Sequence, residues 1–154
     1  MHLVILGCGR SGSALALIMS EKGHQVTVID VDSTSFTRLG KRHKCQVVVG
    51  DGLDEDTLQK ASLQGAEAFV SCTKGDNTNL MVAQMARELY GVKRVGAKVN
   101  DPVRADAYRN QGIFTITPGA MVAGLWRDWL TEQPSGPIDQ YNAFLPELQQ
   151  LMSE

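Results

Sequence analysis

The sequence predicts an α/β protein with a doubly wound, mainly parallel six-stranded sheet that carries helices on both faces. Short apolar runs alternate along the chain with amphipathic segments, and runs that are apolar on both faces are typical of buried parallel strands. A glycine-rich turn directly after the first apolar run is a second, independent indication of this fold class. The predicted strands cover residues 3–6, 25–29, 46–49, 68–71, 94–99 and 113–116.

Helical patterns fill the segments between the strands and continue after the last one. Gly23 and Gly91 follow two of these segments, where glycine commonly ends a helix in the left-handed conformation. Ser33, Asp54 and Asp76 stand where a residue that caps a helix N-terminus is expected. The predicted helices cover residues 12–22, 33–39, 54–61, 77–90, 102–110 and 118–130.

The chain is predicted to contain one domain and a short tail. Its 154 residues, 43% hydrophobic and 21% charged, fit a single soluble globular domain, which we place at residues 1–132. Residues 133–154 are predicted to form a linker, rich in helix-breaking residues, and a C-terminal amphipathic tail. This tail is a short helix or a segment that docks on a partner, and its apolar residues at helical spacing are Phe144, Leu145, Leu148, Leu151 and Met152.

Charge and cysteine usage exclude several classes of protein. The formal net charge of −2 gives no reason to expect a nucleic-acid partner. Cys8, Cys45 and Cys72 are far apart and odd in number, which indicates neither a disulfide framework nor a zinc site and favours the reducing cytoplasm. No apolar run approaches the roughly 20 residues of a membrane-spanning helix.

A GxGxxG string follows the first predicted strand and opens the first predicted helix. Gly7 is expected to make the tight turn, Gly9 to let a pyrophosphate approach the backbone, and Gly12 to let helix and strand pack closely. The unpaired N–H groups of the helix start favour phosphate. This context predicts a Rossmann-type site for an adenine dinucleotide or adenine nucleotide, and the string reads Gly7-Cys8-Gly9-Arg10-Ser11-Gly12.

A carboxylate follows the second strand at the spacing expected for ribose recognition. Asp30 comes 18 residues after Gly12, where its carboxylate would accept hydrogen bonds from an adenosine ribose. Val31 and Asp32 follow without an adjacent arginine, so a 2′-phosphate would meet two carboxylates. NAD(H), ATP or ADP is therefore favoured over NADP(H). Arg10 lies inside the glycine loop, where it either clamps a phosphate or stays an exposed residue of the first helical turn.

Other candidate site residues follow the third, fourth and fifth strands. Asp51 and Gly52 end the third strand, where the carboxylate either reaches adenine or its ribose or is a solvated turn residue. Thr73 and Lys74 end the fourth strand, above the point where ligands bind in doubly wound sheets. Lys98, near the end of the fifth strand, either faces phosphate or lies at the surface.

The last predicted helix has more apolar surface than one face against a sheet can bury. We therefore expect a homodimer built on this helix, through an isologous interface. Its apolar residues are Met121, Val122, Leu125, Trp126, Trp129 and Leu130.

From Met1 to about Leu130, the sequence resembles the RCK/KTN domain, the TrkA N-terminal domain of potassium transport regulators. The glycine string is one matching segment. The others are Val28-Ile29-Asp30, Val49-Gly50-Asp51-Gly52, the segment 73–80 and the segment 97–102.

The resemblance implies a cytosolic regulatory subunit that pairs through its last helix and assembles on a membrane-embedded potassium transporter or channel. Such a subunit would lie at the cytosolic face of the membrane and change conformation when NAD(H), ATP or ADP binds. The resemblance gives Arg10 a phosphate role, Asp30 a ribose role and Asp51 a role near adenine. Gly119 and Ala120 stand where some members carry an acidic metal ligand, so no metal site is expected.

An NAD-dependent oxidoreductase subunit or domain is the alternative. Such an enzyme needs a substrate pocket and a proton donor near the nicotinamide. Tyr90 and Lys93 are three residues apart at a predicted helix end, not four apart on one helix face, and no histidine–aspartate pair stands at motif spacing. The sequence therefore favours a binding protein without catalytic residues.

Overall fold

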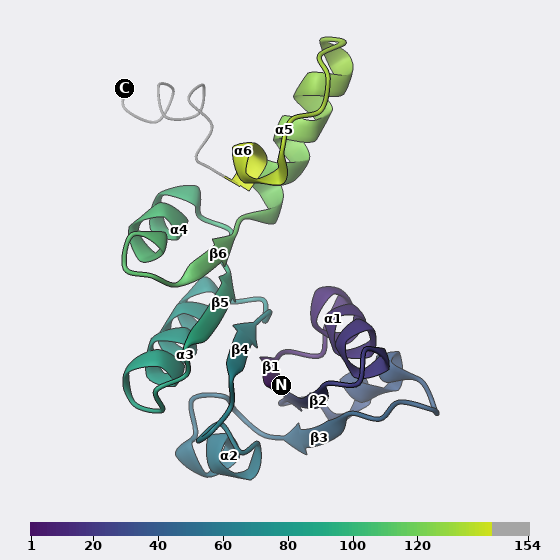
Figure 1. The fold of residues 1–154 in the computed structure, drawn as a ribbon, viewed down its shortest axis with the longest axis vertical. Helices are drawn as coiled ribbons and strands as arrows, with labels where there is room; N and C mark the ends of the chain where they lie inside the picture. The colour runs from purple at the N-terminus through teal and green to yellow at the C-terminus, as the bar shows by residue number, and fades with distance from the viewer. Residues whose placement is uncertain (143–154) are drawn as a thin grey trace.

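A computed structural model describes residues 1–142 of the chain, which form a six-stranded parallel sheet with helices on both faces (Figure 1). The strand order is β3-β2-β1-β4-β5-β6, so the direction of winding reverses between β1 and β4. This confirms the predicted fold class. The strands are β1 (His2–Leu6), β2 (Gln25–Asp30), β3 (Gln46–Val49), β4 (Ala68–Ser71), β5 (Arg94–Lys98) and β6 (Phe114–Ile116).

The helices divide between the two faces of the sheet, and each face has its own core. One core cluster includes Leu58, Leu80 and Ala105 from α2, α3 and α4. The other includes Ala16 from α1 and Leu39 from the 3₁₀ helix η1. The helical elements are α1 (Arg10–Glu21), η1 (Ser33–Leu39), α2 (Glu55–Lys60), α3 (Asp76–Glu88), α4 (Pro102–Arg109), α5 (Pro118–Leu130) and α6 (Ile138–Asn142).

The strand register brings several loops to one edge of the sheet. Leu6 at the end of β1 pairs with Ile29 of β2 and with Ser71 of β4. Asp30 pairs with Val49 at the end of β3. The segments that follow these four strands therefore leave the sheet side by side, as parallel pairing requires.

Helix ends were predicted well at the glycines and less well at the caps. Gly23 and Gly91 have φ angles of +82° and +68°, which confirms the left-handed conformation expected there. Asp54 caps α2 and accepts a hydrogen bond from the backbone N–H of Asp56, as predicted. The predicted cap Ser33 is wrong by one residue, because the Asp32 carboxylate takes the Thr34 N–H at 2.9 Å.

Asp76 was also wrongly predicted as a cap, since Gly75 holds that position and Asp76 is the first residue of α3. Its carboxylate accepts the backbone N–H groups of Asn100 and Asp101 at 2.9 and 3.0 Å. The side chain therefore links the start of α3 to the loop between β5 and α4, a contact 24 residues away in the sequence.

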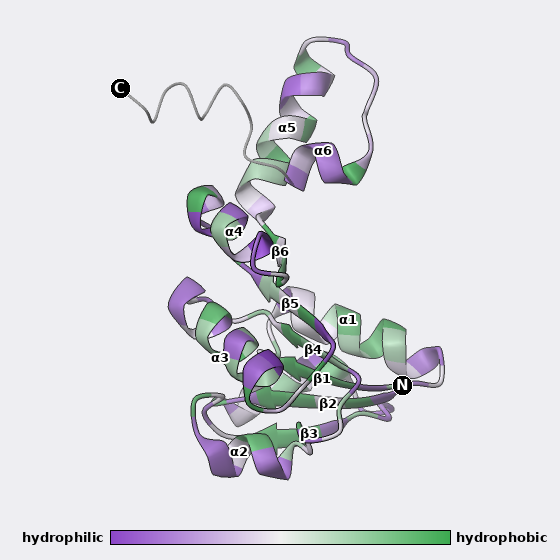
Figure 2. Ribbon diagram, turned by 60° about the vertical axis from the view of Figure 1, so that its left-hand side comes forward, coloured by the Kyte–Doolittle hydropathy of each residue, from purple (hydrophilic) through white to green (hydrophobic). Residues whose placement is uncertain are grey.

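Beyond β6, α5 and α6 form a hairpin that stands off the end of the sheet (Figure 2). The buried hydroxyl of Tyr141 donates to Asp128 Oδ2 at 2.7 Å and accepts the Gly136 N–H at 2.7 Å. A Cβ at Gly124 would lie 2.6 Å from Tyr141 Cδ1, so the close approach of the two helices depends on this glycine.

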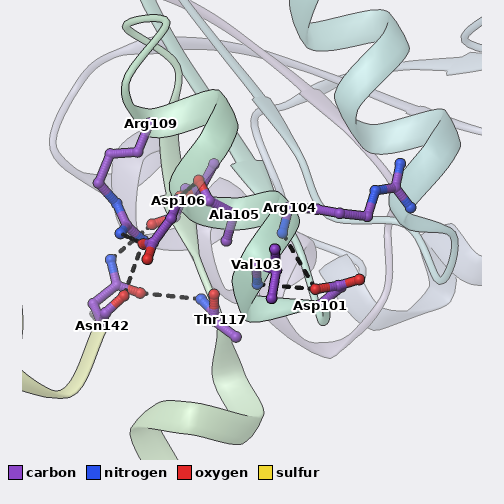
Figure 3. Close-up of polar contacts among 9 residues, drawn as sticks. Asp101, Val103, Arg104, Ala105, Asp106, Arg109, Thr117 and Asn142 are labelled. Atoms are coloured by element: carbon purple, nitrogen blue, oxygen red, sulfur yellow. Dashed lines mark hydrogen bonds and ion pairs between the residues drawn. The ribbon is translucent and has the colours of Figure 1, made fainter. Parts of the chain in front are cut away.

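Asn142 ties the hairpin back to the sheet and to α4 (Figure 3). Its Oδ1 accepts the Thr117 N–H at 3.0 Å, and its Nδ2 donates to the Thr115 carbonyl at 2.7 Å. An Arg109 guanidinium N–H donates to the Asn142 carbonyl at 2.9 Å. The domain boundary at residue 132 stays a prediction, although residues 138–142 pack on α5. The predicted apolar pattern from Phe144 onward lies outside the described residues.

Candidate functional site

The glycine loop joins β1 to α1, and each of its glycines has a different steric environment. Gly7 has a φ of +99°, and a Cβ there would lie 3.0 Å from the Thr73 nitrogen. A Cβ at Gly12 would lie 1.9 Å from the Gly7 carbonyl oxygen, so α1 approaches the loop as closely as predicted. At Gly9, apart from the two adjacent residues, no atom of the described part of the chain lies within 4 Å of the position a Cβ would take. The loop is therefore open at its middle glycine.

Asp30 ends β2 and turns its carboxylate toward the glycine loop. The Cys8 N–H donates to Asp30 Oδ2 at 2.6 Å, and the Asp32 N–H donates to Oδ1 at 3.0 Å. The Gly7 N–H donates to the Ile29 carbonyl at 2.7 Å, one residue earlier. These bonds orient the carboxylate, and each oxygen keeps a lone pair for a further donor.

A cavity of about 580 Å³ opens at this edge of the sheet, above β1, β2 and β4. Eight of its lining residues belong to the site predicted from the sequence: Gly7, Gly9, Asp30, Val31, Asp51, Gly52, Thr73 and Lys74. The structure therefore brings together segments that follow four different strands. The other residues that line the cavity are Leu6, Asp32, Thr34, Ser35, Arg38, Cys72, Gly75 and Thr78.

Five predicted site residues do not line this cavity. Cys8 is buried, and its backbone N–H donates a hydrogen bond to Asp30. Gly12 is also buried and packs against the backbone of Gly7. Arg10 and Ser11 are exposed in the first turn of α1. Lys98 is partly buried at the end of β5. Their roles in ligand binding remain predictions.

The residues of η1 that line the cavity were not predicted from the sequence, because the segment 33–39 was predicted only to be a helix. Arg38 lies in its last turn, and Thr34 and Ser35 lie in its first. The Asp32 carboxylate accepts the Thr34 hydroxyl, and these bonds together with the charge of Arg38 lower the pKa of Asp32. Asp32 therefore stays ionised. The cavity also holds an arginine, although none is adjacent to Asp30 in the sequence.

Asn79, which sequence reasoning also missed, is fully buried and holds the loop between β4 and α3. Its Oδ1 accepts the N–H and the hydroxyl of Thr73 at 2.9 and 2.7 Å. Its Nδ2 donates to the carbonyl oxygens of Thr73 and Lys98, the latter at 2.8 Å. One amide therefore fixes Thr73 in the cavity wall and joins that wall to β5.

The cavity suits a ligand that combines anionic groups with hydroxyl donors. Gly9 and Gly75, the residues just before α1 and α3, both line it, so the positive ends of two helix dipoles meet there. Lys74 adds a cation beside α3, while Asp30 and Asp51 offer acceptors on the other side of β1. Phosphate fits the first region and ribose hydroxyls fit the second.

The described residues contain no cluster of three or more metal-ligating side chains. Cys72 lines the cavity, but burial raises the pKa of its thiol and outweighs the opposing effect of Lys98. This thiol is therefore protonated at neutral pH. Within residues 1–142 there is also no helix of the length and apolarity needed to span a membrane.

The reversed winding of the sheet and the glycine loop at its switch point define a Rossmann-type domain. The chain belongs to the TrkA-N domain family, whose match covers residues 3–117.

Two relatives of this chain are Trk system potassium uptake proteins, named TrkA and TrkA homolog. The Trk system potassium uptake protein TrkA of Streptomyces coelicolor is 49% identical over 116 residues, which are 75% of this chain and 52% of that protein. The TrkA homolog of Methanothermobacter thermautotrophicus is 33% identical over 132 residues, 85% of this chain and 61% of that protein. The chain thus spans between one half and two thirds of the length of these relatives.

Solved structures with the same fold include domains that hold nucleotides. GsuK bound to ADP has a TM-score of 0.72 and 25% identity, covering 84% of this chain and 33% of that chain. The Shewanella denitrificans Kef CTD in AMP-bound form has a TM-score of 0.69 and 18% identity, covering 99% and 91%. The GsuK channel bound to NAD has a TM-score of 0.64 and 20% identity, covering 81% and 22%.

Proposed function

We propose that this chain is a nucleotide-sensing regulatory domain that binds NAD(H), ATP or ADP in the cavity at the glycine loop. The observation that carries the proposal is the cavity itself, where the open middle glycine, Asp30 and two helix N-termini surround one space of about 580 Å³. The ADP-, AMP- and NAD-bound neighbours support the ligand class.

In the proposed pose the ligand lies across the carboxyl ends of the strands. Its phosphates face Gly9 and the first turn of α1, where Arg10 reaches them from outside the cavity wall. Asp30 accepts the ribose hydroxyls, and Asp51 lies near the adenine. This assignment gives the carboxylates of Asp30 and Asp51 and the N–H groups at the start of α1 partners of matching chemistry.

We further propose that the domain regulates potassium uptake. It would lie at the cytosolic face of the membrane and act on a membrane-embedded potassium transporter or channel subunit. The names of the two TrkA relatives and the match to the GsuK channel support this role. Ligand binding would change the conformation of the domain without chemistry.

A homodimer through α5 is part of the proposal. The exposed face of α5 has a shallow groove of about 330 Å³ lined by Val122, Leu125, Trp126 and Trp129. The indole rings of Trp126 and Trp129 meet edge to face with centroids 5.6 Å apart, and the two side chains are 57% and 69% exposed. An apolar surface of this kind is typical of an interface.

Calorimetric titration with ADP, ATP, NAD and NADH tests the ligand proposal, and wild-type protein that binds none of them would contradict it. A parallel assay of NADH absorbance with a panel of carbonyl substrates tests the non-catalytic role. Steady NADH consumption by the purified protein would favour the oxidoreductase alternative. The absence of turnover beside measurable NADH binding is the expected result.

A further inference from the structure

Arg38 lines the proposed nucleotide cavity but has no role in the pose described above. Its turn of η1 is anchored on both sides, because Asp32 caps the element and Leu39 is 3% exposed in the core below α1. Thr34 and Ser35 of the same element also line the cavity. The backbone that carries Arg38 is therefore held in place, and its guanidinium lies at the η1 side of the cavity.

An adenine base has two flat faces that a binding site has to cover. Within residues 1–142, no phenylalanine, tyrosine or tryptophan lines the cavity. Among the described residues of the lining, Arg38 supplies the only guanidinium, and a guanidinium is planar and stacks on aromatic rings. The other lining cation, Lys74, follows β4, so the two cations lie on opposite sides of β1 in the sheet.

The charges around Arg38 favour a base over a phosphate. Asp30 and Asp32 line the cavity together with Arg38, so these three side chains have a net charge of −1. Asp30 is held in place by the Cys8 and Asp32 N–H groups and cannot turn away from an incoming anion without losing both bonds. A 2′-phosphate would therefore meet net repulsion, whereas a neutral adenine ring would not.

We infer that Arg38 stacks its guanidinium on the adenine of the bound nucleotide and so contributes to the binding of that base. The inference rests on the proposed function, because it requires a nucleotide in this cavity. It also fixes the direction of the ligand, with the base toward η1 and the phosphates toward α1 and α3.

The test compares Arg38→Ala, Arg38→Lys and Arg38→Tyr by calorimetric titration of the full chain with ADP, NADH and NADPH. The lysine keeps the charge without a planar group, and the tyrosine keeps a flat surface without the charge. Arg42→Ala is the matched control, because Arg42 is exposed and lies outside the lining. Thermal unfolding without ligand checks that every variant folds like this control.

Stacking predicts that Arg38→Ala weakens ADP, NADH and NADPH binding by a similar factor, about two- to thirtyfold. Arg38→Tyr should recover most of that loss, and more of it than Arg38→Lys does. Recovery by lysine alone, or a loss confined to NADPH, would overturn the inference in favour of a charge contact with phosphate. Unchanged affinity in Arg38→Ala overturns it and leaves the proposed function standing. Wild-type protein that binds neither ADP nor NADH overturns both.

Discussion

The backbone N–H of Cys8 lies 2.6 Å from Oδ2 of Asp30, so the glycine loop and the end of β2 are joined through a single carboxylate. The N–H of Asp32 holds the other oxygen at 3.0 Å. These two bonds orient the carboxylate. Because the protein already orders this side chain, a ribose that binds to it would not incur the entropic cost of ordering it. Such preorganisation favours binding.

Replacing Asp30 by alanine should weaken ADP, ATP and NADH binding together, because all three carry the adenosine ribose. A hydrogen bond to a charged group contributes about 1.5–3 kcal/mol, so we expect roughly a tenfold to hundredfold loss in calorimetric titration. Asp56→Ala is the control, since Asp56 is exposed on α2 and lies outside the cavity lining. Unchanged affinity in the Asp30 variant would show that the ribose assignment is wrong.

The pair formed by Cys8 and Asp30 also illustrates what the sequence can reveal. The glycine string and the distance to Asp30 predict the turn, the helix start and the acidic strand end, because each depends on residues close in the chain. Alternation of apolar runs predicts all six strands for the same reason.

Contacts between distant segments could not be predicted in this way. Arg38 enters the cavity only because η1 packs beside the end of β2, and no spacing rule places it there. Nothing in the sequence distinguishes Asn79 from an ordinary helix residue. Its side-chain amide nevertheless hydrogen-bonds to Thr73 after β4 and to Lys98 of β5. Asp76 was assigned a local cap, but its carboxylate bonds to a loop 24 residues away.

Gly12 should not tolerate any side chain. The Cβ of Gly12→Ala would lie 1.9 Å from the Gly7 carbonyl oxygen, a backbone atom that can move only if the loop moves. Overpacking of this kind costs about 1–3 kcal/mol, which denaturant unfolding measures as a lower midpoint. Gly9→Ala serves as the matched comparison, because, apart from the two adjacent residues, no atom of the described part of the chain lies within 4 Å of its Cβ position. Equal midpoints for the two variants would contradict this account.

Acid should loosen the hairpin of α5 and α6 through Asp128. Hydrogen bonds from the Tyr141 hydroxyl and from Arg127 lower the pKa of this carboxyl. Since the folded-state pKa lies below the unfolded value near 4, the contribution to stability is complete above pH 4 and is lost as the pH falls through the folded-state pKa. Tyr141→Phe removes one of these donors, so its unfolding free energy should fall less than that of wild type between pH 6 and pH 3. An identical pH dependence in the variant would argue against this coupling.

Trp126→Glu should shift the protein from dimer toward monomer in sedimentation velocity. The glutamate would place a charge in the exposed groove on α5, where an isologous interface would have to bury it. Ile18→Glu is the control, because Ile18 is 54% exposed on α1, away from this groove. A wild-type chain that stays monomeric at high concentration would contradict the proposed interface.

Arg10 has the position expected of a residue that distinguishes ligands by their terminal phosphates. It is exposed in the first turn of α1, directly after the open glycine of the loop. ADP and ATP have the same adenosine and the same first two phosphates. They differ in the third phosphate of ATP and in the negative charge that it adds. A ligand shifts a conformational equilibrium only through its different affinities for the two states, so a switch between these nucleotides needs such a group.

Arg10→Ala should therefore narrow the affinity gap between ATP and ADP rather than abolish binding. A charge-assisted contact contributes about 1.5–3 kcal/mol, which corresponds to roughly a tenfold to hundredfold preference. Some affinity should remain, because the N–H groups at the start of α1 do not depend on the side chain. Arg42→Ala is the matched control, because it removes the same charge from an exposed residue outside the cavity lining. If calorimetry gives the Arg10 variant the same ATP-to-ADP ratio as wild type, Arg10 does not couple phosphate charge to the state of the domain.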